Sequence, residues 1–153
     1  MNTHLTRSIL VAVAMAWALA LVACGGGSTT TNVSDGTVGT RVQVGDGAYF
    51  DITPRTLKSW LGDKDYLLVN VAVPYVGEIE STDKFIPLND IEARLAELPQ
   101  RHAKIVVYCR SGSTSAKAAR KLVGLGYSNV WNLEDGMIAW QEAGYPLSSA
   151  EGP

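Results

Sequence analysis

One segment of this chain limits the possible folds more than any other. It is a short apolar strand that runs directly into a cysteine and a Ser/Gly-rich turn. Residues 104–108 read Lys-Ile-Val-Val-Tyr, an apolar and β-branched run that is typical of a buried strand in a parallel sheet. Cys109 follows at once, and small polar residues lead from it into an expected helix that ends near Val123. Strand, tight turn and helix in this order form the repeating unit of an α/β domain.

The rest of the chain repeats this alternation. Thr53 and Pro54 mark the start of a helix, because Thr caps helices and Pro fits their first position. The pattern therefore predicts an α/β fold with a mainly parallel central sheet, in which ligands bind beyond the carboxyl ends of the strands. Strands are expected at residues 49–52, 66–72 and 129–133, a brief extended piece at 85–88, and helices at 55–61, 91–98 and 136–143.

The N-terminus has the pattern of an export signal. Arg7 precedes an uncharged apolar run from Ile9 to Ala23, which is shorter than the about 20 residues that a membrane-spanning helix needs. A basic start, a short apolar stretch and small residues at its end are typical of a secretory signal. Residues 1–23 are therefore predicted to be a signal peptide.

The end of that signal resembles the bacterial lipobox. Leu21-Val22-Ala23-Cys24 is followed by glycines, and in a lipobox the cysteine is lipidated and becomes the first residue of the mature chain. We therefore expect residues 1–23 to be a lipoprotein signal and Cys24 the lipidation site, with acyl chains that anchor the protein to a membrane. The protein would be exported and would face the periplasm or the cell exterior.

Composition separates a tether from a folded domain. Residues 24–40 are rich in Gly, Ser and Thr and carry too little apolar surface to fold, so they are expected to be a flexible tether. Residues 41–153 form the expected domain. The full chain has a net charge of −2, and signal removal takes away Arg7 but no acidic residue. No basic tract is left, so nucleic acid is not an expected partner.

Cysteine usage also bears on function. The chain has two Cys, and if Cys24 is acylated, Cys109 has no intramolecular partner. An exported protein works in an oxidising compartment, where a leftover thiol is more readily explained by chemistry than by structure. The structural alternative is that Cys109 is a small, inert residue buried at a strand end.

The turn after Cys109 is suited to a reactive sulfur anion. Backbone N–H groups in such a turn point inward and the helix N-terminus adds positive potential, which favours a thiolate and an anionic ligand. Arg110 can add to this potential, and the hydroxyls of Ser111, Ser113 and Thr114 can donate to an anion. The alternative roles are structural, with Arg110 solvated and Ser113 and Thr114 capping the helix.

Residues 109–114, Cys-Arg-Ser-Gly-Ser-Thr, resemble the active-site loop of rhodanese (thiosulfate sulfurtransferase) domains. Asp135-Gly136, Ala139-Trp140 and Gly144-Tyr145-Pro146 match the closing pattern of that family. The resemblance implies a three-layer rhodanese-like fold and a sulfurtransferase that needs no metal or organic cofactor. Its donor would be a small sulfur-containing anion such as thiosulfate, and its acceptor a thiol, cyanide or a protein.

The same resemblance implies roles for single residues. Cys109 would be the nucleophile and would carry the sulfane sulfur as a persulfide. The residues implied in substrate binding, through side chains or backbone amides, are Arg110, Ser111, Gly112, Ser113, Thr114 and Ser115.

The chain departs from the family near the end of the second predicted strand. Rhodanese domains usually carry an Asp and an Arg there, whereas this chain has Asn70 and Ala72, and residues 77–83 replace the family's Gly-His-Ile-Pro segment. Glu78 and Asp83 could face the site, although acids in such a loop are more often solvated. These departures favour a second interpretation, a non-catalytic binding or sulfur-relay module at the cell envelope.

Other thiol chemistries fit the sequence less well. A Cys-dependent phosphatase needs an Arg at the sixth position after the Cys, and that position is Ser115. A Cys–His hydrolase needs a nearby His, but His102 precedes the strand that ends at Cys109, roughly 20 Å away along it. Cys and His are too few for a zinc site, and a thiol redox module would need a second nearby Cys. The tryptophans Trp60, Trp131 and Trp140 are expected in the core.

Overall fold

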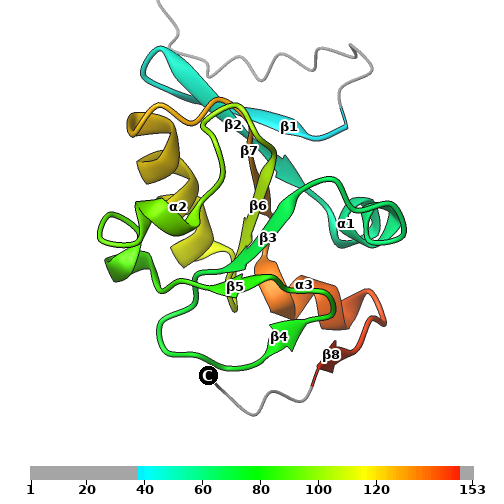
Figure 1. Ribbon diagram of the computed structural model, residues 1–153. Helices are drawn as coiled ribbons and strands as arrows, with labels where there is room; N and C mark the ends of the chain where they lie inside the picture. The colour runs from blue at the N-terminus through cyan, green and yellow to red at the C-terminus, as the bar shows by residue number, and fades with distance from the viewer. Residues whose placement is uncertain (1–37, 149–153) are drawn as a thin grey trace, which may run out of the picture. The chain divides into compact units, whose positions relative to one another are not determined.

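A six-stranded, mainly parallel sheet runs through the computed structural model, which describes residues 38–148 (Figure 1). The predicted signal peptide, the lipidation site Cys24 and residues 25–37 of the predicted tether lie outside the described residues. The strand order is β1-β2-β7-β6-β3-β5, and every neighbouring pair is parallel except β1 with β2. The strands are β1 Thr40–Val44, β2 Gly47–Ile52, β3 Leu67–Asn70, β5 Lys84–Phe85, β6 Ile105–Tyr108 and β7 Val130–Leu133.

Helices cover both faces of this sheet, so the predicted α/β class and layering are confirmed. The helix α2 (Ser113–Gly124) lies on one face, and α1 (Pro54–Trp60) and α3 (Gly136–Glu142) lie on the other (Figure 1). The start of α1 is as predicted, because Thr53 Oγ1 accepts the Thr56 N–H at 3.2 Å. Within residues 38–148, no helix combines the length and the apolar character needed to cross a membrane.

The hairpin of β1 and β2 is missing from the sequence-based prediction. Its strands are joined by the two-residue turn Gly45-Asp46, in which Gly45 adopts a φ of +56°. A Gly-Asp pair between two extended segments is a hairpin signal, because Gly adopts this left-handed conformation without strain. The folded domain consequently includes Thr40, one residue before its predicted start at Arg41.

The helix predicted at residues 91–98 is wrong. The chain there forms two short 3₁₀ turns, η1 (Leu88–Asp90) and η2 (Leu95–Glu97), and neither has a side-chain cap. Pro87 and Pro99 bound the segment on both sides. Leu98, the residue before Pro99, is extended with a φ of −87° and a ψ of 152°, because a following proline disfavours the helical conformation.

The long loop after β3 is tied to the C-terminal end of the domain. Within it, β4 (Glu78–Ile79) pairs with β8 (Leu147–Ser148) in a separate, two-stranded antiparallel sheet. Figure 1 shows this small sheet beside α3. Strands of two residues carry no recognisable periodicity, so this pairing was beyond sequence-based prediction.

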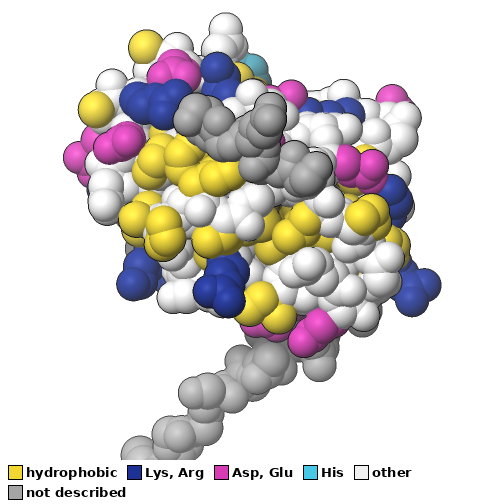
Figure 2. Space-filling view, turned by 90° about the horizontal axis from the view of Figure 1, so that it is seen from below, with side chains coloured by type: hydrophobic (Ala, Val, Ile, Leu, Met, Phe, Trp, Pro, Cys, Tyr) yellow, Lys and Arg dark blue, Asp and Glu magenta, His cyan; other side chains and the backbone are white. Residues whose placement is uncertain are grey.

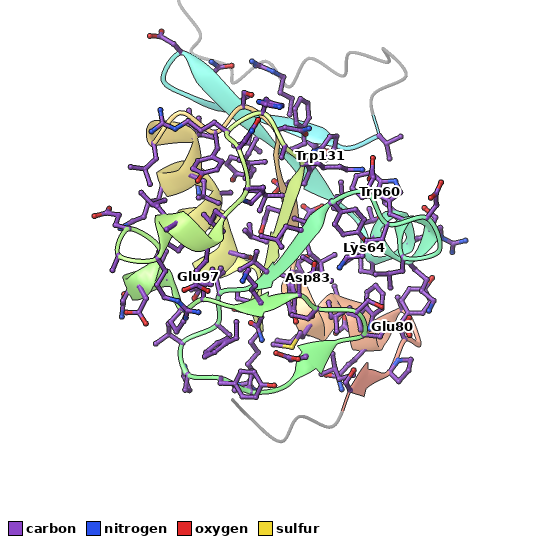
Figure 3. The ribbon with its side chains drawn as sticks, viewed as in Figure 1. Trp60, Lys64, Glu80, Asp83, Glu97 and Trp131 are labelled. Carbon is purple, nitrogen blue, oxygen red and sulfur yellow. The ribbon has the colours of Figure 1, made fainter. Side chains whose placement is uncertain are left out.

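The tryptophans predicted for the core divide into two groups. Trp140 on α3 is fully buried, and its Nε1 donates to the carbonyl oxygen of Pro146 at 2.9 Å. Trp60 and Trp131 are half-buried and pack edge to face beside α1, with ring centroids 5.2 Å apart (Figure 3). The Nζ atom of Lys104, which precedes β6, lies 3.7 Å from the Trp60 ring centre. This aromatic group therefore sits at the opposite end of β6 from Cys109.

Candidate active site

Cys109 lies at the carboxyl end of β6, between the ends of β3 and β7. Its side chain is 2% exposed, and its thiol takes part in no disulfide. The backbone N–H of Ser115, in the first turn of α2, donates to Sγ at an N···Sγ distance of 3.3 Å. The sulfur thus occupies the edge of the sheet at which α/β folds bind ligands.

The turn after Cys109 and the first two residues of α2 hold a run of backbone amides without protein acceptors. Within the described part of the chain, the N–H groups of residues 110–114 donate to no carbonyl or side-chain oxygen. The buried Gly112 shapes the turn with a φ of +78°, and Ser115 Oγ donates to its carbonyl oxygen at 3.0 Å. Consecutive unpaired N–H groups in a turn form a concave anion site, and here that site lies beside a sulfur.

The side chains of the turn are unequally placed. Arg110, Ser111 and Ser113 are exposed, Thr114 is half-buried and Ser115 is buried. The N-cap of α2 is Gly112, with no side-chain cap, so the capping role considered for Ser113 and Thr114 is not seen. Among residues 38–148, no partner engages the guanidinium of Arg110 or the hydroxyls of Ser111, Ser113 and Thr114, which leaves these groups available to a ligand.

Exposed apolar side chains occur near the ends of the strands that flank β6. Seen from below the view of Figure 1, hydrophobic side chains gather across the middle of the molecule, with Lys and Arg around them (Figure 2). Val73 and Val76, from the loop after β3, and Ile138, from the first turn of α3, are among the exposed large hydrophobic residues. Both segments start at strand ends that flank Cys109.

Asn70, which stands where rhodanese domains usually carry Asp, fixes the backbone of the loop after β3 through two hydrogen bonds. It is fully buried. Its Nδ2 donates to the carbonyl oxygen of Gly77 at 2.9 Å, and its Oδ1 accepts the Ala72 N–H at 3.1 Å. A carboxylate could only accept, so the amide is the group that satisfies both partners. Sequence reasoning identified Asn70 as a departure but not its structural role.

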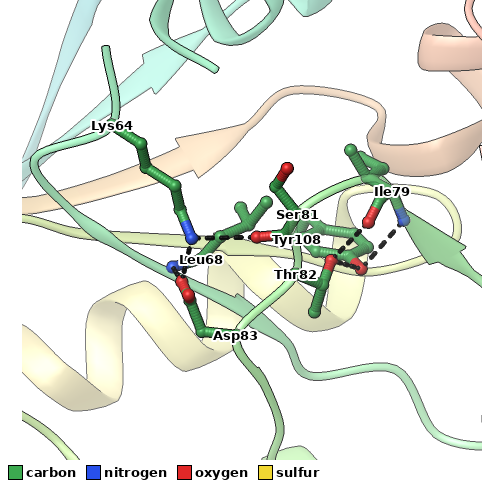
Figure 4. A network of polar contacts seen from close by, with 7 residues as sticks. All are labelled: Lys64, Leu68, Ile79, Ser81, Thr82, Asp83 and Tyr108. Carbon is green, nitrogen blue, oxygen red and sulfur yellow. Dashed lines mark hydrogen bonds and ion pairs between the residues drawn. The ribbon is translucent and has the colours of Figure 1, made fainter. Parts of the chain in front are cut away.

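Tyr108, the residue before Cys109, fixes the loop that replaces the family's usual segment (Figure 4). Its buried hydroxyl oxygen accepts the Ile79 N–H at 3.1 Å and lies 2.6 Å from Thr82 Oγ1. Thr82 donates its own proton to the carbonyl oxygen of Ile79, so the Tyr108 proton points at Thr82. Burial raises the pKa of Tyr108 well above its ordinary value of 10.0. The strand that carries the thiol is thereby bonded to β4.

The two loop acids considered for the site do not contact the turn. Asp83 Oδ2 accepts the Leu68 N–H at 2.7 Å and also pairs with Lys64 (Figure 4). Asp83 therefore holds the loop to β3 and is more than a solvated side chain. Glu78 is half-buried in β4, where its charge helps to raise the pKa of Tyr75 after the larger effect of burial.

A polar group that sequence reasoning missed lies at the ends of β2 and β7. Asn132 is 3% exposed, its Nδ2 donates to Asp51 at 2.7 Å, and its Oδ1 is buried without a partner among the described residues. Burial raises the pKa of Asp51, and burial together with the charge of Asp51 raises that of Glu134. A polar residue in an otherwise apolar strand was the available signal, although no bond joins this group to the Cys109 turn.

His102 is exposed and precedes β6, at the end opposite Cys109. This agrees with the interpretation that it does not pair with the thiol. Residues 38–148 contain no group of three or more His, Cys, Asp or Glu side chains arranged to hold a metal ion.

Replacing Tyr108 with Phe should lower the free energy of unfolding by about 1–3 kcal/mol, because the buried Ile79 N–H loses its acceptor. Tyr66→Phe is the matched control. The Tyr66 hydroxyl is buried but has no partner within residues 38–148, so its removal should be neutral or slightly stabilising. Urea unfolding of both variants measures the difference, and equal losses would show that the Tyr108 contacts contribute nothing.

The comparisons with known proteins agree with this geometry. A sequence model of the family described as rhodanese-like domain matches residues 53–143. A sulfurtransferase from Allochromatium vinosum is 35% identical over 105 residues, which cover 67% of this chain and 97% of that protein. A probable adenylyltransferase/sulfurtransferase MoeZ from Mycobacterium tuberculosis is 34% identical over 100 residues, 62% of this chain but 25% of MoeZ.

Solved structures support the same assignment. A rhodanese-related protein from Thermoplasma volcanium superposes with a TM-score of 0.57 at 29% identity, covering 65% of this chain and 98% of that protein. A rhodanese-like domain protein from Staphylococcus aureus gives a TM-score of 0.54 at 29% identity, with the same coverage of both chains. With the match to the family's sequence model, these similarities show that the chain belongs to the rhodanese-like domain family.

Proposed function

We propose that this protein is a sulfurtransferase that moves a sulfane sulfur from a small anion, such as thiosulfate, to a nucleophilic acceptor through a persulfide on Cys109. The observation that carries the proposal is the position of the sulfur beside the unpaired amides of residues 110–114, with the Ser115 N–H donating to it. Relatives named sulfurtransferase support the reaction class.

The proposed reaction has two displacements. In the first, the Cys109 thiolate attacks the outer sulfur of thiosulfate, the sulfur–sulfur bond of thiosulfate breaks, and sulfite leaves with the bonding electron pair. In the second, cyanide or a thiolate attacks the terminal sulfur of the persulfide and restores the Cys109 thiolate. The products are thiocyanate or an acceptor persulfide. Sulfur passes between nucleophiles, so no further oxidant or reductant is consumed.

The turn supplies binding and charge stabilisation in both displacements. Amides of residues 110–114 are unpaired and can donate to the oxygen atoms of the donor and to the terminal sulfur of the persulfide. Arg110, Ser111, Ser113 and Thr114 have side chains without protein partners among residues 38–148 and can add contacts to the anion. Gly112 and Ser115 act through the backbone, since one shapes the turn and the other donates to Sγ.

A binding or sulfur-relay module is the second candidate function. The observation in its favour is the β3 end, where Asn70 and Ala72 are both buried and give the site neither acid nor base. Thiocyanate formation from thiosulfate and cyanide separates the two candidates. Steady turnover that scales with protein concentration supports the enzyme. A persulfide that forms but passes to neither cyanide nor small thiols would favour the relay, with a protein as acceptor.

We also propose that the protein is exported and held at a membrane by lipid on Cys24, with the domain in the periplasm or at the cell exterior. The signal pattern of residues 1–23 and the lipobox-like end at Cys24 support this. Cys24→Ala should release the protein into the soluble fraction, because the acyl chains are attached at this thiol. Fractionation followed by immunoblotting measures the change, and a variant that remains in the membrane fraction would contradict lipid anchoring.

A further inference from the structure

The first turn of α3 is hydrogen-bonded to the Cys109 turn through its backbone. The Met137 N–H donates to the carbonyl oxygen of Cys109 at 2.9 Å, and the Ile138 N–H donates to that of Arg110 at 3.0 Å. These two carbonyls belong to the peptide groups that follow the sulfur-bearing residue. The start of α3 therefore bonds to two carbonyl oxygens of the turn and leaves the N–H groups of the turn unpaired.

Steric contact reinforces this arrangement. Gly136, with a φ of +58°, lies so close that a Cβ atom there would be 2.2 Å from the carbonyl oxygen of Cys109. A Cβ atom on Gly112 would be 2.7 Å from the backbone nitrogen of Asp135. Two glycines thus allow the Cys109 turn and the start of α3 to meet backbone to backbone.

Because the peptide group is planar, these contacts also fix the direction of the N–H groups in the Cys109 turn. In a trans peptide the C=O of one residue and the N–H of the next point in opposite directions. Holding the carbonyl oxygens of Cys109 and Arg110 toward α3 therefore turns the N–H groups of Arg110 and Ser111 away from it. These are the first two of the unpaired amides beside the sulfur.

We propose that the first turn of α3, residues 136–138, is a positioning element that orients the Arg110 and Ser111 amides toward the donor anion. This role rests on the proposed sulfurtransferase function and adds to it residues that act through their backbone bonds to the Cys109 turn. Loss of one of these hydrogen bonds should weaken the selectivity of the site for anions while Cys109 stays present and reactive.

Ile138→Pro tests the proposal, because it removes the N–H that bonds to Arg110 and proline is tolerated in the first turn of a helix. Ile138→Ala is the matched reference, since it removes the same exposed side chain and keeps the N–H. The measurement is the ratio of Cys109 alkylation rates with iodoacetate, which is an anion, and iodoacetamide, which is neutral. Thiolate reactivity cancels in this ratio, so it reports anion binding independently of sulfurtransferase turnover.

The ratio of the iodoacetate rate to the iodoacetamide rate should be about two- to tenfold lower in Ile138→Pro than in Ile138→Ala. This factor corresponds to the net effect of one hydrogen bond. The apparent KM for thiosulfate should rise by a similar factor. Equal ratios in the two folded variants would overturn the positioning role. A wild-type protein without turnover but with the expected ratios would contradict the enzyme and leave the positioning role standing.

A second measurement covers the case in which the proline variant does not fold. In Cys109→Ser, which cannot consume thiosulfate, binding of thiosulfate should slow hydrogen exchange at the Met137 and Ile138 amides. The Leu61 amide, which bonds to Leu57 on α1, is the internal reference and should not change. Unchanged exchange at Met137 and Ile138 under saturating thiosulfate would overturn the proposal.

Discussion

Replacing Cys109 with Ser should reduce sulfur transfer to the uncatalysed background. A serine hydroxyl is not ionised near neutral pH and cannot form a persulfide, so no carrier for the sulfur would remain. Stability should change by less than about 1 kcal/mol, because Ser is nearly isosteric and can still accept the Ser115 N–H that now donates to Sγ. Thiocyanate formation and thermal unfolding measure the two effects.

Cys24→Ser is the matched control for this variant, because the chain has two Cys and this change removes the other one. It should retain transfer at the wild-type rate. Residual turnover in Cys109→Ser above the background would mean that the sulfur passes through another group. Loss of turnover in Cys24→Ser would place part of the chemistry outside the described domain.

Gly136→Ala should be the most destabilising change of a single glycine in the site. Its added Cβ would lie 2.2 Å from the carbonyl oxygen of Cys109, and its φ of +58° disfavours any L side chain. The left-handed conformation costs about 1–2 kcal/mol and overpacking about 1–3 kcal/mol, so we expect a loss of roughly 2–5 kcal/mol. Denaturant unfolding measures the loss, and the backbone shift should also lower turnover.

Gly45→Ala is the control, since Gly45 has nearly the same φ, +56°, and no atom lies within 4 Å of its added Cβ. It should show the conformational cost alone, about 1–2 kcal/mol. The difference between the two variants isolates the contact between α3 and the Cys109 turn. Equal losses at the two positions would show that this contact is not tight in solution.

Most of the fold could be predicted from apolar runs and from the turn and capping residues between them. The apolar run that became β6 is buried on both faces, and the runs that became β3 and β7 are mostly buried. The turn after Cys109 leads into α2, as the strand–turn–helix pattern predicts. Segments with weaker sequence patterns were not predicted correctly. The helix expected at residues 91–98 had the right spacing of apolar residues, but the segment forms two 3₁₀ turns, and Leu98, which precedes Pro99, is extended.

The candidate site was predictable to the extent that it is local in sequence. The position of Cys109 at a strand end follows from residues 104–114 alone. The contacts that complete the site join distant segments, such as Tyr108 with Ile79 and Tyr108 with Thr82. The bonds from α3 to the Cys109 turn involve backbone atoms and leave no side-chain signature beyond Gly136. Such contacts require three-dimensional information.

Intact-mass spectrometry after incubation with thiosulfate tests the central claim most directly, with the wild-type chain beside Cys109→Ser. We predict that the wild type gains the mass of one sulfur atom, that the gain is lost when cyanide or a thiol is added, and that Cys109→Ser gains nothing. A wild-type chain that gains no sulfur from thiosulfate or any other sulfane donor, or a Cys109→Ser chain that gains as much, would contradict the account.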